Sequence, residues 1–145
     1  MTSFSVVSLS NSNQEQRVIY TTPAASIALS QEMAAGLAEK AALGDGDAAL
    51  ALAEDALVTM KSADIRLHWM QIAAENGNIS AMGALSGLYF RRGGRFHCLR
   101  SLYWLEVYYS KITPEERVKY HVDSEIIRRK NDLKNNIKCK GDSSK

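Results

Sequence analysis

Apolar residues recur every three to four positions from about residue 24 onward, which is the spacing of helices that bury one face. Capping residues and glycines divide this region into six expected helices. In chain order these are a helix from Ser30 to Gly44, Ala48–Val58, a helix from Ser62 or Asp64 to Gly77, Ile79–Arg92, Arg95–Ser110 and 113–138. Strand is expected only before residue 25, so the pattern predicts an all-α fold.

The start signals of these helices have a physical basis. Ser30 precedes a run of strong helix formers, and Asp47 is expected to cap the second helix. Thr113 offers a capping hydroxyl, Pro114 takes the first helical position, and two acids follow at the positive end of the helix dipole. The sixth helix is expected to be continuous. Its apolar face consists of Val118, Val122, Ile126, Leu133 and Ile137.

The two ends of the chain differ from the helical region. Residues 1–25 contain two short apolar runs and are expected to form either a loosely ordered leader or a short β-hairpin. The first 12 residues carry no Lys or Arg and therefore lack the basic segment of a secretory signal. Residues 139–145 are polar and are expected to be a flexible tail. The predicted helical domain is therefore 26–138.

Part of the helical region repeats with a period in the mid-thirties. The matching pairs are Ala48 and Ala81, Leu52 and Leu85, and Trp69 and Trp104. Such periods, each covering two helices, are typical of solenoids in which every hairpin buries its apolar stripe against the next. We therefore expect a short right-handed α-solenoid of stacked helical hairpins, with 113–138 as a C-terminal capping helix. The expected core is Leu52, Ile65, Trp69, Ile72, Ala73, Ala81, Leu85, Tyr89 and Trp104.

One segment of the repeat resembles a known family. Residues 69–78 read Trp-Met-Gln-Ile-Ala-Ala-Glu-Asn-Gly-Asn, and the next repeat opens with Ala81, Leu85 and Tyr89. A tryptophan followed by paired alanines and a Gly-Asn turn is similar to the Sel1-like repeat, a relative of the tetratricopeptide repeat. The resemblance covers about residues 37–110, with about two divergent repeats.

Both ends of this resemblance depart from the family pattern. Ala56 occupies the aromatic position of the first repeat, and Tyr108 and Tyr109 replace the paired alanines of the last. The stack is therefore expected to close after Tyr109. The resemblance implies an adaptor, scaffold or regulator that binds another protein. It also implies an inhibitor as an alternative, and in bacteria one such use is an immunity protein that neutralises a co-encoded toxin.

Composition narrows the class of protein. The chain has 145 residues, of which 46% are hydrophobic and 23% charged, which is the balance of a single folded domain rather than a disordered chain. No run approaches the roughly 20 apolar residues of a membrane span, so no membrane partner is expected. Cys98 and Cys139 are too few for a disulfide scaffold and match no zinc spacing. A cytoplasmic location is expected.

Residues that support catalysis or metal binding are scattered. His68, His97 and His121 form no His-Glu-x-x-His motif. Asp45-Gly46-Asp47 begins like a calcium loop but lacks the glycine and glutamate expected further along. Gly93-Gly94 follows no strand and precedes no Lys-Ser/Thr, so it is not a phosphate loop. We therefore expect no enzyme, no cofactor and no metal site.

Charge is distributed unevenly, and this suggests where a partner binds. Residues 1–90 carry four Lys/Arg and nine Asp/Glu, whereas 91–145 carry fourteen and seven. The planar guanidinium of arginine binds a carboxylate or phosphate group through two hydrogen bonds, and Arg and Tyr are enriched in binding hot spots. The expected partner-binding residues are Arg91, Arg92, Arg95, Arg100, Tyr108 and Tyr109. Their expected partner is another protein with an acidic surface, such as a toxin or a secretion-related protein; ordinary solvated charge is the alternative interpretation.

A second function stays open on the same evidence. The basic C-terminal half suits a regulator that binds nucleic acid, although acids such as Glu115, Glu116 and Asp123 dilute the basic stripe. Phosphate-driven binding weakens steeply with salt, which separates the two functions.

Overall fold

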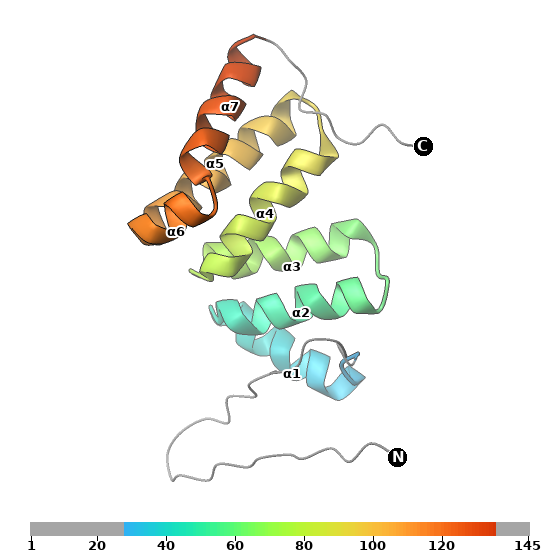
Figure 1. Cartoon of the computed structure of the whole chain (residues 1–145). Helices are drawn as coiled ribbons and strands as arrows, with labels where there is room; N and C mark the ends of the chain where they lie inside the picture. The colour runs from blue at the N-terminus through green and yellow to red at the C-terminus, as the bar shows by residue number, and fades with distance from the viewer. Residues whose placement is uncertain (1–27, 136–145) are drawn as a thin grey trace, which may run out of the picture.

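The computed structural model describes residues 28–135, and within this range every regular element is an α-helix. The seven helices are α1 (Gln31–Ala42), α2 (Gly46–Val58), α3 (Ala63–Glu75), α4 (Ile79–Arg92), α5 (Arg95–Lys111), α6 (Pro114–Lys119) and α7 (Val122–Lys134) (Figure 1). The predicted all-α class is confirmed. The expectations for the leader, 1–25, and for the tail, 139–145, lie outside the described residues.

The helices pack in the order of the chain. From α1 to α5 each helix lies against the next, and α7 returns to pack on α5 (Figure 1). Sequential packing of this kind is consistent with stacked hairpins, because each helix buries one stripe against its predecessor and another against its successor.

Most helix boundaries follow the predicted signals. The Ser30 hydroxyl accepts a hydrogen bond from the Met33 N–H at 3.2 Å, and the Ser62 hydroxyl caps α3 in the same way. Gly44 and Gly77 end their helices with φ of +99° and +89°, a conformation that costs glycine little. Thr113 and Glu116 form a complete capping box at α6.

The start of α2 corrects one prediction. Asp45, not Asp47, is the N-cap, and its carboxylate accepts from the Ala48 N–H at 2.9 Å. The helix therefore begins at Gly46, where a Cβ would lie 3.0 Å from the carbonyl oxygens of Ala73 and Asn76. Only glycine lets the first turn of α2 approach the end of α3 this closely.

Six of the nine residues predicted for the core are buried. Leu52, Ala73, Ala81, Leu85, Tyr89 and Trp104 are buried, while Trp69 and Ile72 are half-buried and pack against this cluster. Ile65, expected in the core, is 42% exposed. The buried face of α3 is centred on Met70, Ala73 and Ala74, so Ile65 lies beyond its edge.

The predicted capping helix is not continuous. His121 has φ of +52°, the left-handed conformation, and separates α6 from α7. A continuous helix would place Val118 and Val122 on one face. Because of the break their exposure differs: Val118 is 73% exposed, whereas Val122 is 3% exposed. The chain bends at His121 because Val122 and Ile126 bury themselves against the end of α5, which a straight continuation of α6 does not reach.

No helix within residues 28–135 is long and apolar enough to cross a membrane. Cys98 is buried in α5. Cys139 lies outside the described residues.

Candidate functional site

The predicted basic cluster lies at the turn between α4 and α5. Arg91, Arg92 and Arg95 are all exposed there, around two glycines that both have positive φ. Arg92 forms an ion pair with Asp64 at the start of α3, and the Arg95 guanidinium donates to the Leu133 carbonyl oxygen at 3.4 Å. Two of the three arginines are therefore anchored to neighbouring helices, while the Arg91 guanidinium lies near Gly87, one turn back along α4.

Arg100 has different surroundings from these three. Its guanidinium carbon lies 4.9 Å from the centre of the Tyr103 ring and 5.8 Å from those of Tyr89 and Trp104. Cations are attracted to aromatic faces at these distances. Arg100 is thus a half-buried side chain held by aromatic rings at the edge of the core.

Tyr108 and Tyr109 lie at the opposite end of α5. Thirteen residues separate Arg95 from Tyr108, which corresponds to about 20 Å along a helix. Tyr109 is half-buried, and the Arg117 guanidinium carbon lies 4.0 Å from the centre of its ring. The structure therefore divides the predicted partner-binding residues into two separate groups.

An exposed apolar stripe on α5 lies between these two groups. Phe96, Leu99 and Tyr103 are 67%, 48% and 49% exposed. They are spaced by three and four residues, so they share one face of α5. The opposite face contacts α4 and α7, which explains why this one stays uncovered within the described residues. The stripe was not among the residues predicted from the sequence, although the helical spacing of large apolar residues outside the core set was its signal.

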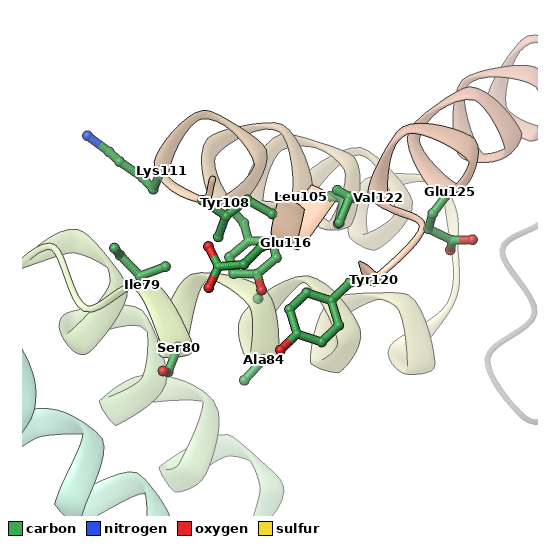
Figure 2. A pocket seen from close by; sticks show the side chains of 12 residues that line it. Ile79, Ser80, Ala84, Leu105, Tyr108, Lys111, Glu116, Tyr120, Val122 and Glu125 are labelled. Atoms are coloured by element: carbon green, nitrogen blue, oxygen red, sulfur yellow. The ribbon is translucent and has the colours of Figure 1, made fainter. Parts of the chain in front are cut away.

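The described residues also form a pocket of about 510 Å³ between α4, α5, α6 and the start of α7 (Figure 2). It is lined by Ile79, Ser80, Gly83, Ala84, Leu105, Tyr108, Lys111, Ile112, Glu116, Tyr120, Val122 and Glu125. Only Tyr108 of these belonged to the predicted site. The lining comes from both sides of the break at His121: α6 and its C-cap supply Glu116 and Tyr120, and α7 supplies Val122 and Glu125.

Two ionisable groups that line the pocket have shifted pKa values. Burial raises the pKa of the Tyr108 phenol, and the nearby Tyr120 and Glu116 raise it further. Hydrogen bonds from Arg128 lower the pKa of the Glu125 carboxyl, although its partial burial opposes this, and Arg129 adds to the lowering. The Tyr108 hydroxyl therefore stays neutral, while Glu125 is a carboxylate already matched by two arginines.

A buried polar network lies next to the pocket. The Ser86 hydroxyl on α4 donates to the Ser101 carbonyl oxygen at 2.8 Å, and the Ser101 hydroxyl donates to the Ser86 carbonyl oxygen at 2.7 Å. Arg129 of α7 donates to both hydroxyls and, at 2.7 Å, to Glu125. Its guanidinium carbon also lies 4.6 Å from the centre of the Phe90 ring. The network ties α7 to both helices of the hairpin beneath it.

The histidines occupy separate places in the described structure. His68 is exposed and makes an edge contact with Trp69, while His97 stacks on Tyr89 with its Nδ1 2.8 Å from the Gly93 carbonyl oxygen. Within residues 28–135 there is no group of three or more His, Cys, Asp or Glu side chains placed to hold a metal ion.

The chain shows no match to any protein-family model, to any curated protein or to any solved structure.

Proposed function

We propose that this protein is a short right-handed α-solenoid of Sel1-like hairpins that binds another protein and is not an enzyme. The sequential packing of α1 to α5 supports the architecture, and the repeat that contains Trp69 and the paired alanines Ala73 and Ala74 supports the family. The expected setting is the cytoplasm.

The observation that carries the proposal is the stripe of Phe96, Leu99 and Tyr103 on α5. Large apolar side chains gathered on one helix face, rather than scattered, mark interaction surfaces. Arg95 and Arg100 border the stripe on its two sides, which gives an apolar centre with a basic rim. This combination fits a partner that presents apolar side chains surrounded by Asp and Glu.

The arrangement of charge favours a protein partner over nucleic acid. In α7, Arg128 forms ion pairs with Glu125 and Asp132, and Lys130 pairs with Glu106 of α5. These cations are largely neutralised within the molecule. Binding to nucleic acid depends on unpaired Lys and Arg side chains, which displace the counterions held by the phosphates. Apolar side chains at the centre of the α5 surface also contribute nothing to the binding of a phosphate backbone.

Adaptor and inhibitor remain two forms of the same proposal. An adaptor holds a partner without altering its activity, whereas an inhibitor such as an immunity protein blocks a toxin that is encoded beside it. The gene neighbourhood and the activity of the captured partner distinguish the two.

The experiment is affinity capture with wild-type protein, followed by binding measurements with the purified partner. Replacing Phe96 and Leu99 with Ser should weaken binding by about tenfold or more, because each removes an apolar contact at the centre of the surface. The matched control replaces Leu43 and Met60 with Ser, since both are almost fully exposed but lie far from α5 in the chain.

The control variant should bind as the wild type does, and both variants should keep the far-UV circular dichroism of the wild type. Equal binding by a folded Phe96→Ser/Leu99→Ser variant would remove α5 from the proposal. Capture of nucleic acid with a steep loss between low and moderate salt would favour the alternative function.

A further inference from the structure

The pocket beneath α6 has one anionic and aromatic wall. Figure 2 shows the side chains of Glu116, Tyr108 and Tyr120 gathered on one side of it, while the Lys111 amino group points away from them. The rest of the lining is mainly apolar, with Ile112 among its members. The pocket therefore combines two carboxylates, of which Glu125 is paired with arginines, with two phenol rings and an alkyl surface.

Glu116 has no cationic partner among residues 28–135. Its Oε2 accepts a hydrogen bond from the Thr113 N–H at 2.9 Å, and no Lys or Arg of the described residues forms an ion pair with it. Glu125, by contrast, is paired with Arg128 and Arg129. Glu116 thus supplies negative charge to the pocket that no Lys or Arg within residues 28–135 neutralises by an ion pair.

We propose that this pocket binds an alkyl cation, meaning an ammonium or guanidinium group on a short apolar chain. Glu116 provides the charge, and the phenol rings of Tyr108 and Tyr120 add an attraction for cations. The Lys119 Nζ already lies 5.1 Å from the centre of the Tyr120 ring. The apolar lining suits the alkyl chain, and a volume of about 510 Å³ lies within the usual range for small-ligand sites.

Two sources carry this chemistry: a Lys or Arg side chain of a peptide, and a free amine. The pocket is built from the face of α5 that contacts α4 and α7, and the apolar stripe lies on the opposite face. The proposal is therefore independent of the function proposed for the stripe, and either can fail without the other.

The test is a titration followed by amide chemical shifts in two-dimensional NMR spectra. The probes are N-acetyl-lysine amide, N-acetyl-arginine amide and butylamine, with N-acetyl-norleucine amide and butyrate as uncharged and anionic controls. We expect the cations to bind with a dissociation constant on the order of 1 mM, as suits ligands of so few atoms. Their shifts should centre on residues such as Ile79, Ala84 and Ile112.

The amino-acid amides and the free amine distinguish the sources. Tighter binding of the amides points to a peptide side chain, and tighter binding of butylamine points to a free amine. Binding of norleucine amide or butyrate as tight as that of the cations would overturn the proposal, and so would the absence of shifts around the pocket at saturating cation.

Glu116→Gln is the decisive variant, because glutamine keeps the acceptor of the capping box and removes only the charge. It should weaken cation binding by about tenfold, the order expected for one charge in partial contact with solvent. Glu115→Gln is the matched control, since Glu115 is the preceding residue and does not line the pocket. Unchanged binding by Glu116→Gln would refute the role of the carboxylate.

A second variant keeps the test valid if Glu116→Gln impairs folding. Tyr120 is half exposed, so Tyr120→Leu should leave the fold intact while it removes a ring from the pocket. We expect it to weaken binding of the cations severalfold, and unchanged binding would contradict the aromatic part of the proposal.

Discussion

Replacing Arg129 with Ala should destabilise the protein, because this side chain joins α7 to the rest of the stack. Its guanidinium is buried, donates to the Ser86 and Ser101 hydroxyls and to Glu125, and lies over the Phe90 ring. Removing it eliminates three charge-assisted hydrogen bonds and the packing of its alkyl stem on the hairpin.

The magnitude depends on what the substitution leaves behind. Breaking a buried ion pair costs about 3–5 kcal/mol when the remaining partner is stranded without compensation. Here Glu125 keeps its bonds from Arg128, and both serine hydroxyls keep donating to carbonyl oxygens. No group is stranded, so we expect a smaller loss of about 2–3 kcal/mol in the free energy of unfolding.

The assay is urea denaturation followed by far-UV circular dichroism and tryptophan fluorescence. Arg128→Ala is the matched control, because Arg128 pairs with the same Glu125 but is half exposed, and it should cost less than about 1 kcal/mol. Arg129→Lys keeps the charge but removes the planar guanidinium, so its loss of stability should fall between the losses of the other two variants. A loss of stability for Arg129→Ala no greater than that for Arg128→Ala would show that the buried network contributes little to the free energy of unfolding.

Two further substitutions test the packing and the electrostatics of the stack. Gly46→Ala should lower stability by about 1–3 kcal/mol in thermal or urea denaturation, since its Cβ would meet two main-chain carbonyl oxygens at 3.0 Å; Gly36→Ala, with nothing within 4 Å, should instead raise it by about 0.5–1 kcal/mol. Burial alone would raise the pKa of the Asp55 carboxyl, but the Leu29 N–H and Lys61 hold it below its usual 3.8. The resulting stability is present above pH 3.8 and is lost as the pH falls through the lowered pKa, so the advantage of wild type over Asp55→Asn, about 1–2 kcal/mol at neutral pH, should shrink in acid. A pH-independent difference, or equal effects of the two glycine substitutions, would contradict these assignments.

The helices could be located from the sequence because their signals are local. Ser30, Ser62 and Thr113 each bond to an N–H three residues along, so the partner is specified by the helix itself. The start of α2 shows where this fails. Asp45 and Asp47 are both good caps, and the choice depends on the close approach of Gly46 to α3, which no local rule contains.

The pocket and the buried network depend on contacts between distant parts of the chain. Arg129 is 43 residues from Ser86 and 28 from Ser101, so nothing near any one of them in the sequence indicates the bond. The bend at His121 is equally hidden. No glycine or proline marks it, and the left-handed conformation is offset by the burial of Val122 against α5.

The position of α7 has a consequence for self-association. A stack of hairpins grows in principle by adding copies head to tail, and an open addition of this kind produces filaments rather than closed assemblies. Arg129 fixes α7 across the faces of α4 and α5 that a further hairpin would need. Another copy of the chain that added at this end would have to displace α7 from the Ser86 and Ser101 hydroxyls, so we expect α7 to oppose polymerisation through α4 and α5.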